Sequence, residues 1–331
     1  MKVVITGGAG FLGTALAQTL LESRSLPGSD GRPQQISQLT LIDIAPSRLA
    51  PDSRVRALVG SITDPNVVEQ ALEPDTDAIF HLAAVVSGQA EADFDLGMRA
   101  NFDATRLLLE RARHGGRKPR FVLASSVAVF GGALPTMVED DTAPTPQSSY
   151  GTQKLLCELL MSDYSRKGFV DGRALRMPTI CIRPGAPNKA ASSFASGIIR
   201  EPLAGETAVC PVSPDTLMWL MSPSCAIGNL LHGQSLEPEA LGNARVINMP
   251  GLSISVGEMV DALERFAGAA TAKRVRWEPD PNIARIVNSW PGRFATPRAT
   301  GLGFKADANF ADIIRAHVDA AGLGATSNAT T

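Results

Sequence analysis

The sequence lacks the features that mark membrane, secreted and nucleic-acid-binding proteins. No apolar run approaches the roughly 18 residues that a membrane-spanning helix needs. The first residues, MKVVITGGAGFLG, contain one lysine and reach glycine after a short apolar run, so they do not form a secretory signal. The 31 basic and 33 acidic side chains give a formal net charge of -2 at pH 7, which offers no general attraction to phosphate backbones or anionic lipids. We therefore expect a cytoplasmic protein without a nucleic-acid or membrane partner.

Cysteine is also scarce, and its placement disfavours a disulfide framework. The four cysteines form no CxxC pair and are spread as Cys157, Cys181, Cys210 and Cys225. Such spacing favours reduced core thiols over a zinc site, so we expect no metal. Hydrophobic residues make up 44% and charged residues 19%, which is typical of a globular chain.

Short apolar runs alternate with helix-like segments in the first half of the chain. The runs are VVIT (3–6), TLIDI (40–44), RVRALVG (54–60), DAIFHLA (77–83) and RFVLASS (120–126). Continuous apolar strands separated by helices are typical of a parallel sheet that is covered on both faces. The sequence therefore predicts an α/β fold, a Rossmann-type doubly wound parallel sheet with a smaller, discontinuous C-terminal substrate lobe.

The domain limits follow from where this alternation fades. We expect a nucleotide-binding domain over residues 1–175, to which a later segment near 244–268 returns. Residues 176–321 are expected to form mainly the substrate lobe, and 322–331, without apolar periodicity, a flexible tail. The proline- and glycine-containing stretch 23–38 predicts a surface loop insertion.

A glycine-rich turn follows the first predicted strand and precedes a helical pattern. In TGGAGFLG, Gly7 would allow a tight turn, Gly10 would let the backbone approach a pyrophosphate, and Gly13 would let helix and strand pack closely. Phe11 and Leu12 would begin the helix that faces the phosphates. A glycine turn without a ligand is the alternative, but the strand, the spacing and the helix together favour a dinucleotide site.

Asp43 ends the second strand, where a carboxylate can bind the adenosine ribose hydroxyls and repel a 2′-phosphate. This favours NAD over NADP as the cofactor. Two alternatives stay open: Asp43 could merely cap a turn, and Arg48 could serve a 2′-phosphate.

Tyr150 and Lys154 lie four residues apart on one face of a helix predicted over 150–167 and opened by Ser148 or Ser149. A free phenol, with a pKa of about 10, is a poor base at neutral pH, but a neighbouring ammonium favours the phenolate. We therefore interpret Tyr150 as the proton-transferring residue, with Ser126 orienting the substrate. Ser125 is the second choice for that serine, and a strand-end turn is the alternative for both.

These motifs resemble the extended short-chain dehydrogenases, also called the NAD-dependent epimerase/dehydratase family. The similar segments are TGGAGFLG (6–13), Asp43, HLAA (81–84), Asn101, SSVAVFG (125–131) and YGTQK (150–154). The resemblance implies proton transfer by Tyr150 with Lys154 and Ser126. It also implies cofactor contacts from Ser61, Ile62, Ala83, Asn101, Ser125 and Pro178, besides the glycine loop and Asp43.

The segment 144–205 resembles the subgroup of this family that oxidises D-erythronate, a four-carbon sugar acid. Thr179 and Phe130 replace the asparagine and tyrosine that relatives acting on nucleotide sugars carry at these positions. The resemblance implies oxidation of the C2 hydroxyl to a 2-oxo acid.

An acid substrate needs donors or a cation at its carboxylate. The candidates for substrate contact are Ser126, Thr179, Arg183, Asn188 and Ser192, with Lys189 and Ser193 nearby. Arg183 could instead pair with a carboxylate between the lobes, and Asn188 could cap a helix. Trp219 and Trp290 are interpreted as packing residues.

Two other functions stay open. A nucleotide-sugar epimerase or dehydratase would share the fold and Tyr150. A cofactor-binding regulator without chemistry is disfavoured by the intact catalytic residues. The family often pairs two long helices from each subunit, so the segments near 92–113 and 150–167 predict a homodimer.

Overall fold

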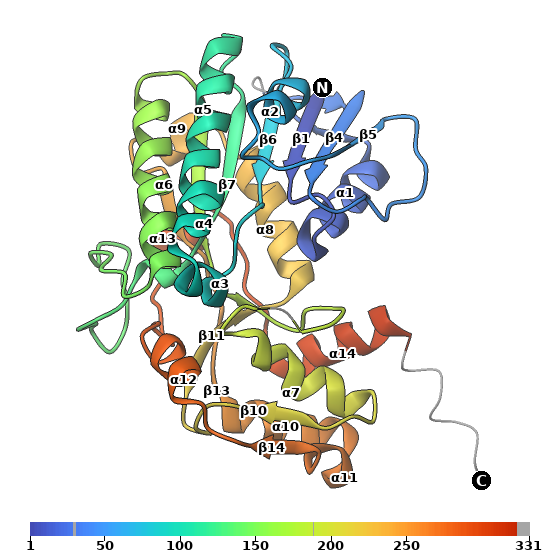
Figure 1. Ribbon diagram of the computed structural model, residues 1–331, viewed down its shortest axis with the longest axis vertical. Coiled ribbons are helices and arrows are strands. Elements are labelled where there is room, and N and C mark those ends of the chain that lie inside the picture. The colour runs from blue at the N-terminus through green and yellow to red at the C-terminus, as the bar shows by residue number, and fades with distance from the viewer. Residues whose placement is uncertain (29–30, 188, 323–331) are drawn as a thin grey trace.

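The computed structural model describes residues 1–28, 31–187 and 189–322, and its centre is a seven-stranded sheet (Figure 1). The strand order is β12-β8-β7-β6-β1-β4-β5, and all neighbouring strands are parallel. The strands are Lys2–Thr6 (β1), Gln38–Asp43 (β4), Val55–Val59 (β5), Ala78–His81 (β6), Arg120–Ser126 (β7), Asp171–Met177 (β8) and Val246–Asn248 (β12). The chain builds outward from β1 first to one side and then to the other, which opens a crevice beyond the carboxyl ends of β1 and β6. The predicted doubly wound sheet is confirmed.

Helices cover both faces of this sheet because its strands carry apolar side chains on both. Val3 and Ile5 pack in one core with α1 (Phe11–Ser23) and α8 (Pro223–Ser235). Val4 packs in a second core on the opposite face. The helices of that face are α2 (Pro65–Ala71), α5 (Ala104–Gly115) and α6 (Ser149–Arg166). Between β6 and α5 the chain forms α3 (Ser87–Ala92), α4 (Phe94–Gly97) and a π-helical turn, Met98–Asp103.

A separate core forms the second lobe below the sheet in Figure 1. Its main helices are α7 (Ser193–Leu203), α10 (Val256–Ala267) and α14 (Phe310–Ala321). Two small sheets accompany them, β10 (Ala208–Cys210) with β14 (Val275–Trp277), and β9 (Thr179–Ile180) with β11 (Leu217–Met221) and β13 (Leu252–Ser255). The short helices are α9 (Pro238–Leu241), α11 (Ala269–Ala272), α12 (Pro281–Val287) and α13 (Pro297–Gly301).

The segment expected to return to the nucleotide domain, 244–268, divides between the two cores. Its first part, β12, pairs with β8 in the central sheet, whereas α10 packs against α7 and α14 in the second lobe. The chain also comes back to the nucleotide domain earlier than expected, because α8, which precedes this segment, already packs on α1, β7 and β8. The domain limits themselves stay a prediction.

One further segment differs from its expected structure. The stretch 23–38 is not only a loop, because it contains an antiparallel hairpin of β2 (Ser25–Pro27) and β3 (Pro33–Gln35), with Leu26 buried against the sheet core. At the end of the central sheet, β8 stops at Met177, and Pro178 separates it from β9, which joins another sheet. The predicted tail 322–331 lies, except for Gly322, outside the described residues.

Candidate active site

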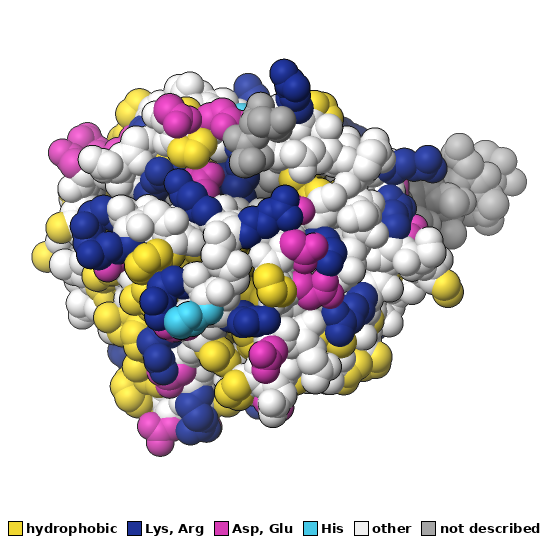
Figure 2. Space-filling view, turned by 90° about the horizontal axis from the view of Figure 1, so that it is seen from above, with side chains coloured by type: hydrophobic (Ala, Val, Ile, Leu, Met, Phe, Trp, Pro, Cys, Tyr) yellow, Lys and Arg dark blue, Asp and Glu magenta, His cyan; other side chains and the backbone are white. Residues whose placement is uncertain are grey.

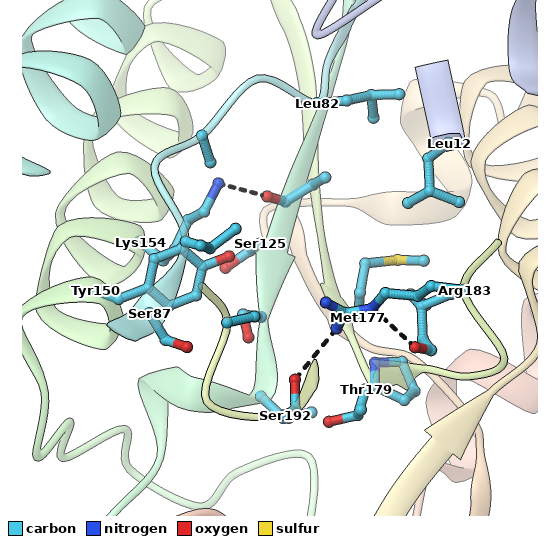
Figure 3. A pocket seen from close by; sticks show the side chains of 18 of the residues that line it. Leu12, Leu82, Ser87, Ser125, Tyr150, Lys154, Met177, Thr179, Arg183 and Ser192 are labelled. Atoms are coloured by element: carbon cyan, nitrogen blue, oxygen red, sulfur yellow. Dashed lines mark hydrogen bonds between the residues drawn. The ribbon is translucent and has the colours of Figure 1, made fainter. Parts of the chain in front are cut away.

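A cavity of about 200 Å³ lies where the carboxyl ends of β6, β7 and β8 meet the second lobe (Figure 3). This is the edge at which parallel α/β sheets bind ligands. The predicted site residues that line it are Phe11, Leu12, Ser125, Ser126, Tyr150, Lys154, Pro178, Thr179, Arg183 and Ser192. Residues from five separate parts of the chain therefore meet at one place.

Tyr150 and Lys154 reach the cavity from the first turns of α6. The helix begins here because the Ser148 side chain accepts a hydrogen bond from the N–H of Gly151. Lys154 Nζ donates to the carbonyl of Ala124 at 2.9 Å and lies 5.6 Å from the centre of the Tyr150 ring. Among the described residues none is hydrogen-bonded to the Tyr150 hydroxyl, which leaves it free for a ligand.

The two serines at the end of β7 have different partners. Ser125 Oγ donates to Glu158 at 2.5 Å, so its proton is already used within the protein. Ser126 Oγ accepts from the N–H of Ala128 at 3.1 Å and keeps its own proton for an oxygen in the cavity. Ser126 thus caps a turn and can also bind a substrate, which supports it over Ser125.

Arg183 supplies a half-buried cation on the opposite wall of the cavity (Figure 3). Its Nε donates to the carbonyl of Ile180 at 2.9 Å, and its Nη2 donates to Ser192 Oγ at 3.1 Å. Within the described parts of the chain it forms no ion pair, and burial lowers the pKa of its guanidinium. The described lining contains Lys154 as a second cation and no carboxylate. The cavity is therefore built for an anion.

The glycine loop fits a dinucleotide by its close contacts. Gly7 has φ +74°, which favours glycine, and a Cβ on Gly13 would lie 2.0 Å from the carbonyl oxygen of Gly7. Gly10 caps α1 without a side chain, so the first N–H groups of that helix stay available for phosphate oxygens. The order of strand, turn and helix is the one predicted.

Asp43 lies beside this loop at the end of β4. Its carboxylate accepts hydrogen bonds from the N–H groups of Ala9 at 3.0 Å and Ala45 at 3.1 Å. Asp43 therefore caps the turn, and each carboxylate oxygen keeps a lone pair for a ribose hydroxyl. Gly60 N–H donates to the Asp43 carbonyl at 2.8 Å, which brings the following Ser61 and Ile62 to the same edge.

Two other predicted cofactor residues support the backbone around the site and do not line the cavity. Ala83 lies against the glycine turn, since a Cβ on Gly7 would be 2.9 Å from its nitrogen. Asn101 is buried, with Oδ1 accepting from Val85 N–H at 2.7 Å and Nδ2 donating to Gln153 Oε1 at 2.7 Å. A cofactor contact by Asn101 stays a prediction.

Comparison with known proteins agrees with this geometry. The model of the NAD dependent epimerase/dehydratase family matches residues 3–219. The chain belongs to this family. The chain is 57% identical to D-erythronate dehydrogenase from Cupriavidus necator, over 98% of this chain and 99% of that one, and 49% identical to the enzyme of the same name from Haemophilus influenzae, over 96% and 99%. A solved structure, described as the nucleoside-diphosphate-sugar epimerase from Agrobacterium tumefaciens, is 45% identical and superposes with a TM-score of 0.89 over 96% of this chain and 94% of that one.

Membership of this family confirms NAD as the cofactor. NAD would be held by the glycine loop at its pyrophosphate, by Asp43 at the adenosine ribose, and by Lys154 near its nicotinamide end. Across the described residues no group of histidine, cysteine, aspartate and glutamate side chains could hold a metal ion. None of the helices in the described ranges is both long and apolar enough to span a bilayer.

Some residues of the cavity were not predicted from the sequence. Trp290 packs against the core of the second lobe, as expected, and also lines the cavity from the loop after α12. Ser87 also lines it, and no motif marks it in the sequence. Trp219 packs against Phe294 with ring centres 5.2 Å apart, as expected. The candidate Asn188 lies outside the described residues.

Proposed function

We propose that the protein oxidises the C2 hydroxyl of D-erythronate to 2-oxo-D-erythronate, with NAD as the hydride acceptor. The observation that carries this proposal is the half-buried Arg183 guanidinium, which faces the same cavity as Tyr150 and has no acidic partner in the described chain. The names of the two relatives at 57% and 49% identity support the same substrate.

Arg183 and Ser192 are positioned to hold the substrate carboxylate. A guanidinium binds a carboxylate through directed, charge-assisted hydrogen bonds, which are strongest where water is excluded. Thr179, which is 8% exposed, can donate its hydroxyl proton to another substrate oxygen. A substrate carboxylate bound in this way would bring the adjacent carbon, C2, between Arg183 and Tyr150.

Tyr150 accepts the proton of the C2 hydroxyl as the C2–H electron pair leaves with its hydrogen. Bound NAD supplies the acceptor for that hydride. Ser126 donates its proton to the substrate oxygen and fixes it near Tyr150, while Lys154 Nζ lies 5.6 Å from the centre of the Tyr150 ring on the same helix. The substrate thus loses a hydride from C2 and a proton from the hydroxyl, and the C2–O single bond becomes a carbonyl.

The test combines the purified protein with NAD and a panel of four- to six-carbon aldonic acids, uronic acids and nucleotide sugars. We expect NADH to form with D-erythronate and Tyr150→Phe to abolish it. Absence of NADH with every acid, together with conversion of a nucleotide sugar, would instead assign the epimerase activity named for the 45%-identical structure.

We also propose that the active form is a cytoplasmic homodimer with α6 at its interface. Leu159 is 63% exposed and Leu156 36% exposed on this helix, which leaves an apolar strip for a second copy. The face shown in Figure 2 is different in kind: basic, acidic and apolar side chains are mixed on it, and it has no continuous basic surface. Leu159→Arg is expected to give monomers in analytical ultracentrifugation, whereas a dimer that survives it would exclude this interface.

A further inference from the structure

A buried carboxylate behind the active site has no part in the mechanism above. Glu158 is 1% exposed and follows Tyr150 and Lys154 along α6 at intervals of four residues. Because residues four apart share one face of a helix, Glu158 faces the same sheet edge as the catalytic pair. The contacts that Glu158 makes can therefore affect where the catalytic side chains lie.

Arg176 of β8 fixes the orientation of this carboxylate. Arg176 Nε lies 3.0 Å from Oε1 of Glu158, and Nη2 lies 2.8 Å from Oε2. The guanidinium is itself held, since its carbon lies 4.8 Å from the centre of the Phe130 ring and Nη1 donates to Asn248 Oδ1 at 3.2 Å. A two-point pair of this kind leaves the carboxylate one orientation.

The fixed carboxylate accepts the hydrogen bond of Ser125 at 2.5 Å. The residue before it, Ala124, is bound through its carbonyl to Lys154. Two successive residues at the end of β7 are thus tied to α6, and Ser126 comes next. Successive side chains of a strand point to opposite sides, so holding Ser125 toward Glu158 also sets the direction of Ser126.

We propose that Glu158 is a positioning residue for the oxidation: by accepting the Ser125 hydrogen bond while paired with Arg176, it fixes the end of β7 so that Ser126 faces the substrate and Tyr150. This inference rests on the proposed function only for the choice of substrate. Without the Glu158 charge, the Ser125 hydroxyl would be released at the cavity wall and Arg176 would be left as an unpaired buried cation.

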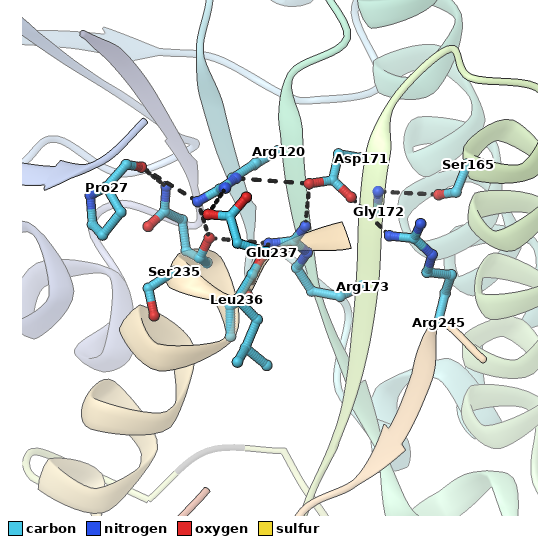
Figure 4. A network of polar contacts seen from close by, with 12 residues as sticks. Pro27, Arg120, Ser165, Asp171, Gly172, Arg173, Ser235, Leu236, Glu237 and Arg245 are labelled. Atoms are coloured by element: carbon cyan, nitrogen blue, oxygen red, sulfur yellow. Dashed lines mark hydrogen bonds and ion pairs between the residues drawn. The ribbon is translucent and has the colours of Figure 1, made fainter. Parts of the chain in front are cut away.

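Three variants separate positioning from stability. Glu158→Gln removes the charge that orients both partners, and Ser125→Ala removes only the serine bond while the ion pair remains. Asp171→Asn is the matched control, because Asp171 pairs with Arg173 in a comparably buried site at the opposite end of β8 (Figure 4). Rates are expressed per NADH-binding site, measured by the fluorescence of bound NADH, and unfolding temperatures are recorded for all three.

We expect Glu158→Gln to lower kcat roughly tenfold and Ser125→Ala about threefold, because small errors in the placement of reacting groups reduce rates strongly. KM for NAD should stay within about twofold in both. Asp171→Asn should lower the unfolding temperature without changing kcat per site.

The proposal is overturned if kcat per site of Glu158→Gln stays within twofold of the wild type, or if Asp171→Asn loses as much. If Glu158→Gln does not fold, Ser125→Ala is the deciding variant: a kcat per site within twofold of the wild type overturns the proposal. Wild-type turnover of D-erythronate tests the proposed function alone. The ratio of variant to wild-type kcat, with whichever substrate the wild type converts, tests Glu158 alone.

Discussion

His81 should make the protein less stable in mild acid. It ends β6 in the core, where Nδ1 is hydrogen-bonded to Thr6 Oγ1 at 2.7 Å and Nε2 to Thr105 Oγ1 at 2.8 Å. Burial, with a smaller contribution from the charge of Lys154, lowers the pKa of His81 from 6.5 to about 3. The folded protein therefore keeps this ring neutral over a range in which the unfolded chain protonates it.

The sign and size of the effect follow from proton binding. Below pH 6.5 the unfolded state binds one proton more than the folded state, so the free energy of unfolding falls as the pH falls. Each pH unit in that window removes about 1.4 kcal/mol, which gives a loss of about 2 kcal/mol between about pH 7 and pH 5. The stabilisation is complete above pH 6.5 and is lost progressively as the pH falls toward about 3.

Urea unfolding near pH 7, 6 and 5, followed by circular dichroism, measures this loss. His81→Gln can keep both hydrogen bonds but cannot be protonated. We expect His81→Gln to be less stable than the wild type near neutral pH, because it loses the ring packing against Phe121. Near pH 5 the difference between their free energies of unfolding should be smaller by about 2 kcal/mol, because only the wild type loses that stability as the pH falls. His114→Gln, at a side chain that is 63% exposed and whose contact with Glu110 lies at the surface, is the control, and its loss of stability between about pH 7 and pH 5 should match that of the wild type. Half-buried His317, whose pKa burial also lowers, contributes equally to all three proteins. An equal loss of stability in His81→Gln and the wild type would refute the reasoning.

Three further changes test the cofactor and substrate sites. Gly13→Ala should weaken NADH binding at least tenfold by fluorescence titration, because its Cβ would lie 2.0 Å from the oxygen of Gly7; Gly228→Ala, with no atom within 4 Å, is the matched control. Asp43→Ala should relax the preference for NAD over NADP, and an unchanged activity ratio would reject its ribose contact. Arg183→Met should raise KM for the sugar acid roughly 10- to 100-fold while KM for NAD stays the same, and equal changes in both KM values would contradict a carboxylate role.

The cofactor half of the site was predictable because its chemistry depends on short-range sequence patterns. Strand, glycine turn and helix are consecutive in the chain, so the positions of Gly7 and Gly13 follow from local geometry alone. Tyr150 and Lys154 share a helix face for the same reason. The alternation of apolar strands and helices likewise specified a parallel sheet before any contact was known.

The substrate half depended on contacts that only the folded chain creates. Trp290 reaches the cavity from a loop far along the chain, and no periodicity marks it. Arg183 stands out by its place on the cavity wall, half-buried and without an acidic partner in the described chain, and that place is a property of the packed lobes. The roles of Ser125 and Ser126 were also open in the sequence.

The sequence by itself determined the sheet, the dinucleotide loop and the catalytic helix, because each is encoded by residues within one or two turns or strands. Only the tertiary structure decided that Ser126, and not Ser125, keeps its hydroxyl proton for a ligand. The Ser125 proton is bound by Glu158 of α6, which meets Arg176 of β8 only after the sheet has formed. It also decided that β12 and α10, adjacent in the chain, belong to different cores. In both cases the deciding contact joins segments that are distant in sequence, and no local propensity specifies it.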